Sequence, residues 1–461
     1  MNTRDSPARF NVSQETAIIQ TMERARNQSG GSFTLYQNGA RPSRLGLLLW
    51  YNVDTLQAQP ALRSGHHVME VLIVPGLKKL LVLSASYGEG HQQAANAVRD
   101  ALAVMSPQTE VRIVDYMKSV HPMLDSVVKY FYLKSVRFAP ALYGWFYKGT
   151  SQISPQSLLQ RQLNSLGIAE MEEHLRDFQP DVVLATFPTP AGVVSYLKQK
   201  GRIDVPLATV ITDHAIHSQW LHPLTNAYFV GSEHVRMGLL ARGVPADMVH
   251  ATGIPVRPTF LQEFDRDALR RKYNLDPNLP TVLVMGGAYG VMGDISLICE
   301  ELFTYPHPLQ VIVVAGRGKR MKAQLDEAKL TATNPVKVYG FVPEIQELMA
   351  VSDLMLTKAG GLTISEALAI QLPMVLYRPI PGQEVQNAKF LVRSGVATLA
   401  RNRKQVRDHL YDLLIAHPEK RASMQKKALL IRKLSSAEEI AEILISLANQ
   451  RPTRAHYLYQ H

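Results

Sequence analysis

The chain has 461 residues, 46% of them hydrophobic, and a mean hydropathy of −0.07, which is ordinary for a soluble globular protein of two or three domains and excludes disorder of the whole chain. The net charge of +11 and the pI of about 9.5 favour an anionic partner: a nucleic acid, a nucleotide or an acidic membrane surface. A single cysteine excludes an internal disulfide framework and a cysteine-based zinc site, and so favours a reducing compartment.

Residues 1–76 form the first predicted unit, an N-terminal extension rich in Gln, Ser, Asn and Arg. We expect this extension to be poorly ordered and to have no catalytic role. It lacks the basic and then apolar plan of a signal peptide, and no run of eighteen apolar residues occurs in the chain. We therefore expect a cytoplasmic protein that touches a membrane only at its surface.

Short apolar runs alternate with helical patterns from residue 77 onward. The first set of strand-like runs is LKKLLVLSAS, TEVRIVDY, PDVVLATF, VPLATVITD and NAYFVGS. A proline-bearing linker, TGIPVRPTF, separates it from a second set, which is PTVLVMGG, LQVIVVAGRG, VKVYGFV, SDLMLTK and LPMVLYRP. This rhythm predicts an α/β protein with two doubly wound, Rossmann-like domains at residues 77–255 and 256–425, followed by a helical tail at residues 426–461.

The first loop of interest is SASYGEGH, which follows a strand and opens an Ala-rich helix. Gly88 and Gly90 keep side chains away from the backbone, which indicates that a ligand comes close there. A phosphate-binding turn is one interpretation of this loop. His91 lies at the positive end of the helix dipole, which keeps its imidazole neutral and able to accept a proton, and a helix cap is its alternative role.

Residues 118–149 carry the next feature, an interleaving of basic and aromatic side chains. The stretch places Lys129, Lys134, Arg137 and Trp145 among further Tyr and Phe residues, which suits the headgroup region of an anionic membrane. Each basic residue near such a surface contributes roughly 1 kcal/mol. A buried helical hairpin is the alternative, while single-stranded nucleic acid is disfavoured because no nucleic-acid motif accompanies the stretch.

Three loops of the second predicted domain are candidates for ligand binding. VLVMGGAYGVMGD has four glycines after a strand, although a flexible turn has the same composition. KAGGLTISEA turns at a glycine pair into a helix whose N-terminus suits a pyrophosphate, and Glu366 can accept from both hydroxyls of a ribose. PGQEVQNAKFL places Gln383 and Glu384 after a turn, with Asn387 on the same helical face, which suits a hexose. An ordinary glycine turn and a helix cap are the alternatives for the last two loops.

Seven stretches in this order resemble the diacylglycerol glycosyltransferases of glycosyltransferase family 28, which are the monogalactosyldiacylglycerol synthases of plants and bacteria and the bacterial processive diacylglycerol glucosyltransferases. They are SASYGEGHQQAANAV, ATFPTP, TDHAIHSQW, ATGIPVRPTF, GGAYGVMG, KAGGLTISEAL and PGQEVQNAKFL. The resemblance implies a GT-B fold, in which two Rossmann-like domains face each other across a cleft. It also implies an inverting, metal-independent enzyme without a cofactor, acting on diacylglycerol at the inner face of the cell membrane with UDP-galactose or UDP-glucose as donor.

The resemblance also implies roles for individual residues. His91 takes the proton of the lipid hydroxyl, and Asp213 is the rival base or the carboxylate that orients it. The acceptor and membrane set is Gly88, Glu89, Gly90, Lys129, Lys134, Arg137, Trp145 and Trp220. The donor-binding set is Gly287, Tyr289, Gly290, Arg317, Phe341, Val342, Gly361, Leu362, Thr363, Glu366, Gln383 and Glu384.

Two other functions stay open at this point. One is a GT-B transferase for another lipid acceptor, such as an undecaprenyl-linked muramyl peptide, although the GEGH and TDHAIHSQW loops disfavour it. The other is a catalytically silent membrane-binding module with the same fold. The choice between galactose and glucose, the number of sugars added and the oligomeric state are also left open by the sequence.

Overall fold

The structure is a computed structural model, and it describes residues 76–86, 89–120, 140–150, 157, 167–286 and 294–449. The predicted N-terminal extension therefore lies, apart from Gly76, outside the described residues. The predicted membrane-contact segment is described only at its two ends, up to residue 120 and from residue 140.

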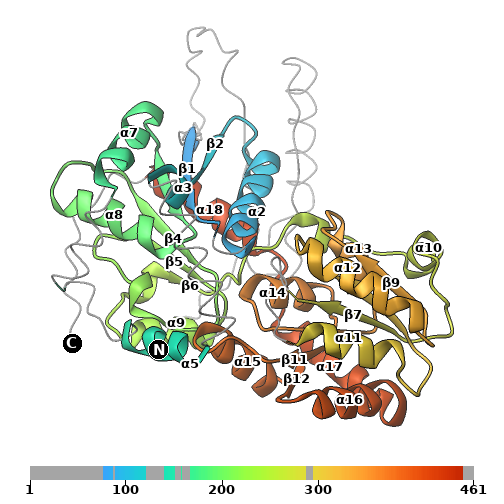
Figure 1. The fold of residues 1–461 in the computed structure, drawn as a ribbon. Helices are drawn as coiled ribbons and strands as arrows, with labels where there is room; N and C mark the ends of the chain where they lie inside the picture. Colours follow the sequence, from blue (N-terminus) through green and yellow to red (C-terminus); the bar gives the residue numbers. More distant parts are fainter. Residues whose placement is uncertain are drawn as a thin grey trace, which may run out of the picture. The chain divides into compact units, whose positions relative to one another are not determined.

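The first sheet has six parallel strands in the order β2-β1-β3-β4-β5-β6 (Figure 1). The strands are β1 (Lys79–Ser84), β2 (Glu110–Asp115), β3 (Val182–Ala185), β4 (Leu207–Ile211), β5 (Ala227–Val230) and β6 (Val249–His250). Since β1 pairs with β2 on one side and with β3 on the other, the chain changes direction across the sheet at β1. The carboxyl ends of β1 and β3 therefore form a switch point, where α/β sheets bind ligands.

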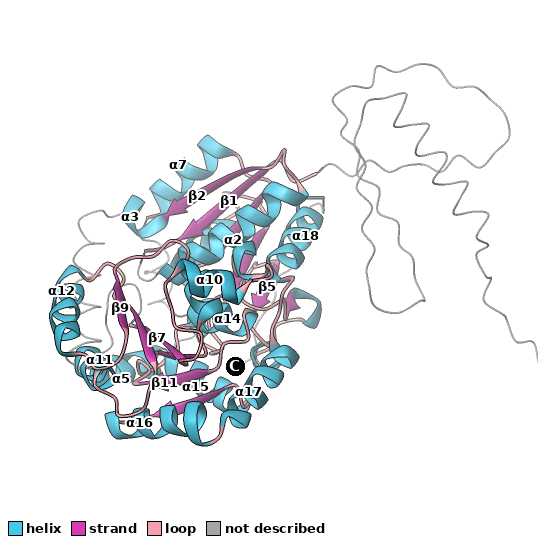
Figure 2. Cartoon of the chain, turned by 90° about the vertical axis from the view of Figure 1, so that its right-hand side faces the viewer, coloured by secondary structure: helices cyan, strands magenta, loops and turns pink. Residues whose placement is uncertain are grey.

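Helices cover both faces of this sheet because alternate strand residues point to opposite sides. Leu80 and Val82 pack with α2 (Glu89–Met105) and α18 (Ser436–Asn449). Leu81 and Leu83 pack with the helices of the other face, which are α3 (Tyr116–Val120), α7 (Ile168–Phe178) and α8 (Pro188–Gln199). Figure 2 shows the first two strands between these two groups of helices. The remaining helices of this half are α5 (Pro140–Thr150), η1 (Ser218–Trp220), α9 (Glu233–Leu240), η2 (Ala246–Met248) and η3 (Pro258–Phe260).

The second sheet also has six parallel strands, in the order β12-β11-β10-β7-β8-β9. They are β7 (Thr281–Met285), β8 (Gln310–Val314), β9 (Val336–Tyr339), β10 (Leu354–Thr357), β11 (Met374–Tyr377) and β12 (Ala397–Ala400). Here the switch point lies between β7 and β10. Two of the loops predicted to hold the donor follow these two strands directly, so the topology agrees with a ligand site there.

Two apolar clusters cover the faces of the second sheet. Val282 and Val284 face α11, α12, α16 and α17, whereas Leu283 faces α13, α14, α15 and the far end of α17. The helices of this half are α10 (Arg266–Lys272), α11 (Ile295–Phe303), α12 (Lys319–Ala328), η4 (Lys329–Thr331), α13 (Ile345–Val351), α14 (Gly361–Ala369), α15 (Gln383–Arg393), α16 (Arg403–Tyr411), η5 (Asp412–Ala416) and α17 (Pro418–Ile431). The predicted pair of Rossmann-like sheets is confirmed.

The last described helix, α18, returns to the first sheet. Its residues Ile440 and Leu444 belong to the cluster built on β1 and α2, and the hydroxyl of Ser436 donates to the carbonyl oxygen of Ile254 at 3.3 Å. The predicted start of the helical tail at residue 426 falls inside α17, and the predicted domain limits stay predictions. Among the described helices, none combines the length and the apolar character needed to cross a bilayer.

Candidate active site

Loops from the two sheets meet at the N-terminus of α14. The chain leaves β10 at Thr357, and α14 begins at Gly361 after Gly360. A Cβ atom on Gly361 would collide with the carbonyl oxygen of Thr212 and lie 3.1 Å from Oδ1 of Asp213, in the loop after β4. The helix start predicted to hold a diphosphate therefore touches the loop that carries Asp213. Only glycine at position 361 leaves room for this close approach.

Asn387, on α15, joins the same loops by hydrogen bonds. Its amide nitrogen donates to Oδ1 of Asp213 and to the carbonyl oxygen of Ala359, both at 2.9 Å. Its amide oxygen accepts the backbone N–H of His214 at 2.7 Å, and the side chain is fully buried. The amide is therefore committed to protein partners and does not bind a hexose, which corrects the interpretation drawn from the helical spacing.

Replacing Asn387 with leucine is expected to lower the free energy of unfolding by about 2–4 kcal/mol, because a carboxylate and two backbone groups would stay buried without their partner. Urea denaturation measures this change. Gln386, the exposed neighbour on the same helix, provides the matched control. Gln386→Leu should leave the stability almost unchanged, and equal stabilities of the two variants would contradict the role given to Asn387.

Glu384, at the start of α15, is buried and already paired. Its Oε1 lies 2.6 Å from Nζ of Lys358, and its Oε2 accepts the backbone N–H of Ile380 at 2.9 Å. Each carboxylate oxygen keeps a second lone pair with which it can accept from a sugar hydroxyl. The sequence analysis missed Lys358 as a site residue, although its position at a strand end, directly before the glycine turn, was an available signal.

Asp213 has a strongly shifted pKa, raised to about 7. Burial is the main cause; the hydrogen bond from Asn387 opposes the rise, the nearby Glu384 adds to it and Lys358 lowers it. Both protonation states of the carboxyl are therefore populated near neutral pH. This is the range that suits a group taking part in proton transfer.

His91 lies in the first turn of α2, partly buried beside aromatic rings. Its Nδ1 is 3.0 Å from Oγ1 of Thr212, and its ring centroid is 5.1 Å from that of Phe187 and 6.3 Å from that of Trp220. Burial lowers the pKa of His91 to about 4, against a smaller upward effect of a hydrogen bond with the backbone of Thr186. The imidazole is therefore neutral at cellular pH, and burial adds a stronger reason for this than the helix dipole considered from the sequence.

Arg317 and Glu89 connect the two sheets at another point. Arg317 follows β8, Glu89 begins α2, and their side chains form an ion pair of 3.0 Å. The guanidinium also lies 5.4 Å from the ring centroid of Phe341, a residue with 53% of its surface exposed. Because Arg317 is half exposed, this ion pair is weak, and a diphosphate can compete for the guanidinium.

Glu366 is buried on α14, and burial raises its pKa to about 8. The nearby Arg257 opposes this rise. Arg257 belongs to the predicted linker, and its guanidinium donates to the carbonyl oxygen of Pro343 at 3.4 Å, next to Phe341 and Val342. The residue predicted to hold the ribose therefore has a cationic neighbour that the sequence analysis missed.

Two family models match the chain in the order of its two sheets. The model for monogalactosyldiacylglycerol (MGDG) synthase matches residues 91–256, and that for the glycosyltransferase family 28 C-terminal domain matches residues 281–444. A relative named processive diacylglycerol beta-glucosyltransferase, from Bacillus thuringiensis (strain Al Hakam), is 36% identical over 328 residues, which are 71% of this chain and 83% of that relative. The chain belongs to the diacylglycerol glycosyltransferases of glycosyltransferase family 28. A relative of the same name from Bacillus cereus (strain G9842) is 35% identical over the same shares.

Solved structures share the fold of this diacylglycerol glycosyltransferase. MurG of Acinetobacter baumannii has a TM-score of 0.52 and 13% identity, with 80% of this chain and 99% of that chain covered. UDP-GlcNAc 2-epimerase from Neisseria meningitidis, solved with UDP-GlcNAc, has a TM-score of 0.53 and 17% identity, with 80% and 100% covered. At these identities the likeness concerns the fold alone, and it confirms the predicted GT-B fold.

The structure brings several members of the predicted donor and acceptor sets together. Cβ of Leu362, on α14, lies 3.6 Å from the position that a Cβ atom on Gly90 would take, so the first turns of α14 and α2 abut. Thr363 is partly buried on α14, and Val342 packs against the core of the second sheet. Gln383 begins α15, beside Glu384. The catalytic and binding roles of all these residues stay predictions.

Seven predicted site residues lie outside the described part of the chain. They are Gly88, Lys129, Lys134, Arg137, Gly287, Tyr289 and Gly290.

The two tryptophans of the predicted acceptor and membrane set have opposite environments. Trp145, on α5, has 74% of its surface exposed. Trp220 has only 6% exposed, because it packs in an apolar cluster of the first sheet. A buried ring does not reach a membrane surface, so the prediction of membrane contact is wrong for Trp220, while its position beside His91 leaves the acceptor role as a prediction.

Within the residues that the structure describes, no three His, Cys, Asp or Glu side chains form a group that could hold a metal ion.

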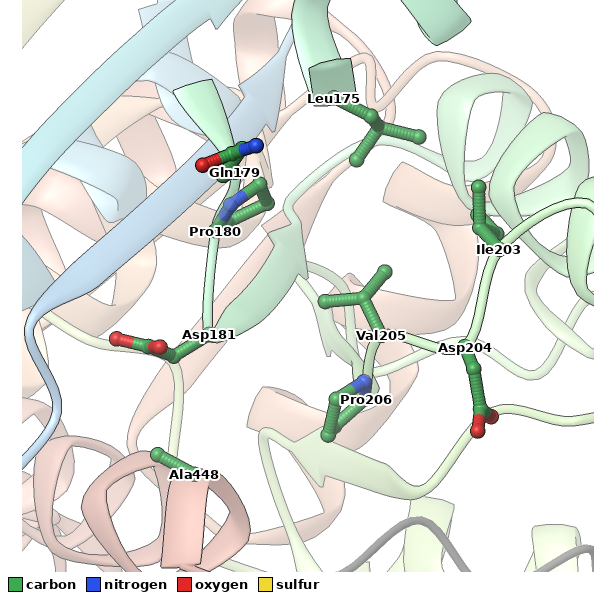
Figure 3. A pocket seen from close by; sticks show the side chains of 9 residues that line it. All are labelled: Leu175, Gln179, Pro180, Asp181, Ile203, Asp204, Val205, Pro206 and Ala448. Atoms are coloured by element: carbon green, nitrogen blue, oxygen red, sulfur yellow. The ribbon is translucent and has the colours of Figure 1, made fainter. Parts of the chain in front are cut away.

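A surface pocket lined by Asp181, Asp204 and Pro206 lies before β3 and β4 (Figure 3). This is the amino-terminal edge of the parallel sheet, opposite the edge that carries His91 and Asp213, so the pocket is separate from the candidate site.

Proposed function

We propose that this diacylglycerol glycosyltransferase moves a hexose from a UDP-hexose to the free hydroxyl of 1,2-diacylglycerol, with inversion, giving a β-glycosyl diacylglycerol. UDP-glucose is the first candidate donor because the relatives that match both halves of the chain are named diacylglycerol beta-glucosyltransferases. UDP-galactose is the second, because the family model matching the first sheet is that of MGDG synthase.

One observation carries this proposal: the acceptor-side groups lie against the donor-side helix. His91 contacts Thr212, and Asp213 is the residue after Thr212. Thr212 and Asp213 both border Gly361 at the start of α14. A base and a diphosphate-binding helix N-terminus therefore come within reach of one hexose.

In the proposed reaction, the neutral imidazole of His91 accepts the proton of the lipid hydroxyl as the hydroxyl oxygen bonds to the anomeric carbon of the hexose. The bond from that carbon to the UDP oxygen breaks, and its electron pair leaves with UDP. Asp213 orients the acceptor or stabilises the positive charge that develops at His91. Attack from the face opposite UDP turns an α-linked donor into a β-linked product.

The negative charge on the leaving UDP requires stabilisation. The N-terminus of α14 supplies N–H groups that have no partner within the helix, together with the positive end of its dipole. Arg317 can turn from Glu89 to the diphosphate, which places a full positive charge at the departing oxygen. We propose that these groups act without a metal ion.

We further propose that the enzyme works peripherally at the inner face of the cell membrane. The exposed Trp145 and the exposed Lys148 on α5 combine an amphipathic ring with a cation, which suits the headgroup region of an anionic leaflet.

A donor comparison tests the proposed function. We expect protein incubated with diacylglycerol vesicles to form organic-soluble product from labelled UDP-glucose faster than from labelled UDP-galactose. Product mass and thin-layer mobility give the number of sugars added. A preference for UDP-galactose would reverse the choice of donor, and no product from either donor would reject the function.

Replacing Glu366 with alanine is expected to weaken UDP binding about 100-fold, because two hydrogen bonds between the ribose and the buried carboxyl group are lost. Calorimetry with UDP measures this effect. Association with vesicles should be unchanged, since Glu366 is buried on α14, whereas the proposed membrane contact is on α5. Unchanged UDP affinity in this variant would contradict the donor site and favour a silent membrane-binding module.

A further inference from the structure

Helix α5, which ends the predicted membrane segment, contacts the turn that precedes α15 (Figure 1). A Cβ atom on Gly144 would lie 2.7 Å from Cβ of Pro381, and one on Gly382 would lie 2.8 Å from the ring of Tyr147. Gly382 also has a φ of 107°, which favours glycine for a second, independent reason. A glycine on each side therefore allows the helix and the turn to pack closely.

Tyr147 contacts the acceptor side as well. Its ring centroid lies 4.5 Å from that of His217, and Nε2 of His217 donates to the carbonyl oxygen of Tyr147 at 3.2 Å. Nδ1 of His217 accepts the backbone N–H of Gln219, so one neutral tautomer satisfies both contacts. His217 belongs to the loop after β4 that carries Asp213, and Tyr147 thus stands between this loop and the turn at Gly382.

The turn at Gly382 leads directly into the residues predicted to bind the hexose. Gln383 and Glu384 follow it at the start of α15. Lys358 and the backbone of Ile380 hold the carboxylate of Glu384, whereas Tyr147 packs against the backbone of the turn before it. The conformation of the turn therefore depends on α5, a helix that belongs to the other half of the chain.

We propose that Tyr147 is a positioning residue of the hexose subsite: by packing on Gly382, it holds the turn in the conformation that presents Gln383 and Glu384 to the sugar. The inference rests on the proposed function, since it assumes a UDP-hexose donor. The ring prearranges the turn before the donor arrives, so binding does not have to order it. The same helix exposes Trp145, so the segment predicted to meet lipid also sets the geometry of the donor sugar site.

Calorimetric titration with UDP and, separately, with UDP-glucose and UDP-galactose tests this assignment. Tyr147→Ala is expected to weaken UDP-hexose binding about tenfold relative to UDP binding. Without the ring, the turn would have to be ordered on binding, and this would cost about as much binding free energy as one hydrogen bond supplies. UDP affinity should stay at the wild-type value, since the predicted donor residues proposed to bind the nucleotide lie on α14 and, as Phe341 and Val342, in the loop after β9. A residue with a merely structural role would not separate the two ligands in this way.

Three further variants keep the test decisive. Gly144→Ala introduces the clash with Pro381 while favouring the helix itself, so it should reproduce the selective loss in a folded protein. Tyr147→Phe keeps the ring and should keep the wild-type ratio of the two dissociation constants. Tyr411→Ala, on the remote helix α16, is the matched control and should bind both ligands as the wild type does.

The outcomes separate the two proposals. A wild-type ratio in both Tyr147→Ala and Gly144→Ala, or an equal loss of UDP and UDP-hexose, overturns the role of Tyr147 and leaves the proposed function standing. Wild-type protein that binds UDP but neither UDP-hexose overturns both.

Discussion

His91→Ala is expected to lower kcat for hexosyl transfer by about 10²–10⁴-fold, the usual contribution of a general base. The ring is neutral because burial lowers its pKa to about 4, and it lies where the acceptor-side loops meet the start of α14. The affinity for UDP should not change, because the proposed nucleotide site lies on the helices and loops of the second sheet, whereas His91 belongs to α2 of the first. Initial rates with diacylglycerol vesicles and calorimetry with UDP measure the two quantities on one preparation.

His174→Ala is the matched control for this prediction. Like His91, His174 is partly buried and lies beside a hydroxyl group: its Nε2 is 2.6 Å from the hydroxyl of Ser119. It belongs to α7, however, and not to the candidate site. The His174→Ala variant should transfer hexose at the wild-type rate. Transfer at the wild-type rate by His91→Ala would show that His91 is not the base.

Asp213→Asn is expected to lower kcat/KM at pH 8 by about 100-fold and to change its dependence on pH. The raised pKa of about 7 means that the ionised fraction of Asp213 increases as the pH rises from 6 to 8. If the ionised carboxylate is required, wild-type kcat/KM rises about tenfold per pH unit below 7 and levels off above it. Burial lowers the pKa of His91 to about 4, which is too low for His91 to produce this change.

The Asp213→Asn variant should therefore lack the rise of kcat/KM near pH 7. Asp181→Asn is the control and should retain this rise, because Asp181 accepts backbone N–H groups at the opposite edge of the sheet. A rise near pH 7 that persists in Asp213→Asn would assign the titration to another group.

The raised pKa of Asp213 also affects the stability of the fold. Because folding raises the pKa of Asp213 above its usual value, the folded protein binds the proton more tightly, and this carboxyl lowers the free energy of unfolding as the pH rises from about 4 to 7.

The fold and the location of the site were predictable because they depend on local patterns. Each strand is a short apolar run, and Gly90 and Gly361 lie in the first turns of α2 and α14, the helices that follow β1 and β10 at the two switch points. In parallel sheets the strand ends share one edge, so a sequence that shows strands and loops in order also shows which loops share that edge. His91, Glu366 and Gln383 could be chosen in this way.

The partnerships across the two sheets could not be predicted. Asn387 and Asp213 are 174 residues apart in sequence, and nothing local to either indicates the hydrogen bond that joins them. The same holds for Glu89 with Arg317 and for Tyr147 with Gly382, where the contact depends on how elements far apart in the sequence pack against each other. The helical spacing of Asn387 indicated its face correctly but could not show that a loop of the other sheet already occupies that face.

The most direct test of the proposed function is the product formed by wild-type protein and by His91→Ala from labelled UDP-glucose or UDP-galactose and diacylglycerol vesicles, with UDP binding measured on the same samples. We expect β-hexosyl diacylglycerol from the wild type, and at least about 100-fold less from His91→Ala with equal UDP affinity. Wild-type protein that binds UDP but transfers no label to lipid from either donor would contradict the proposed function.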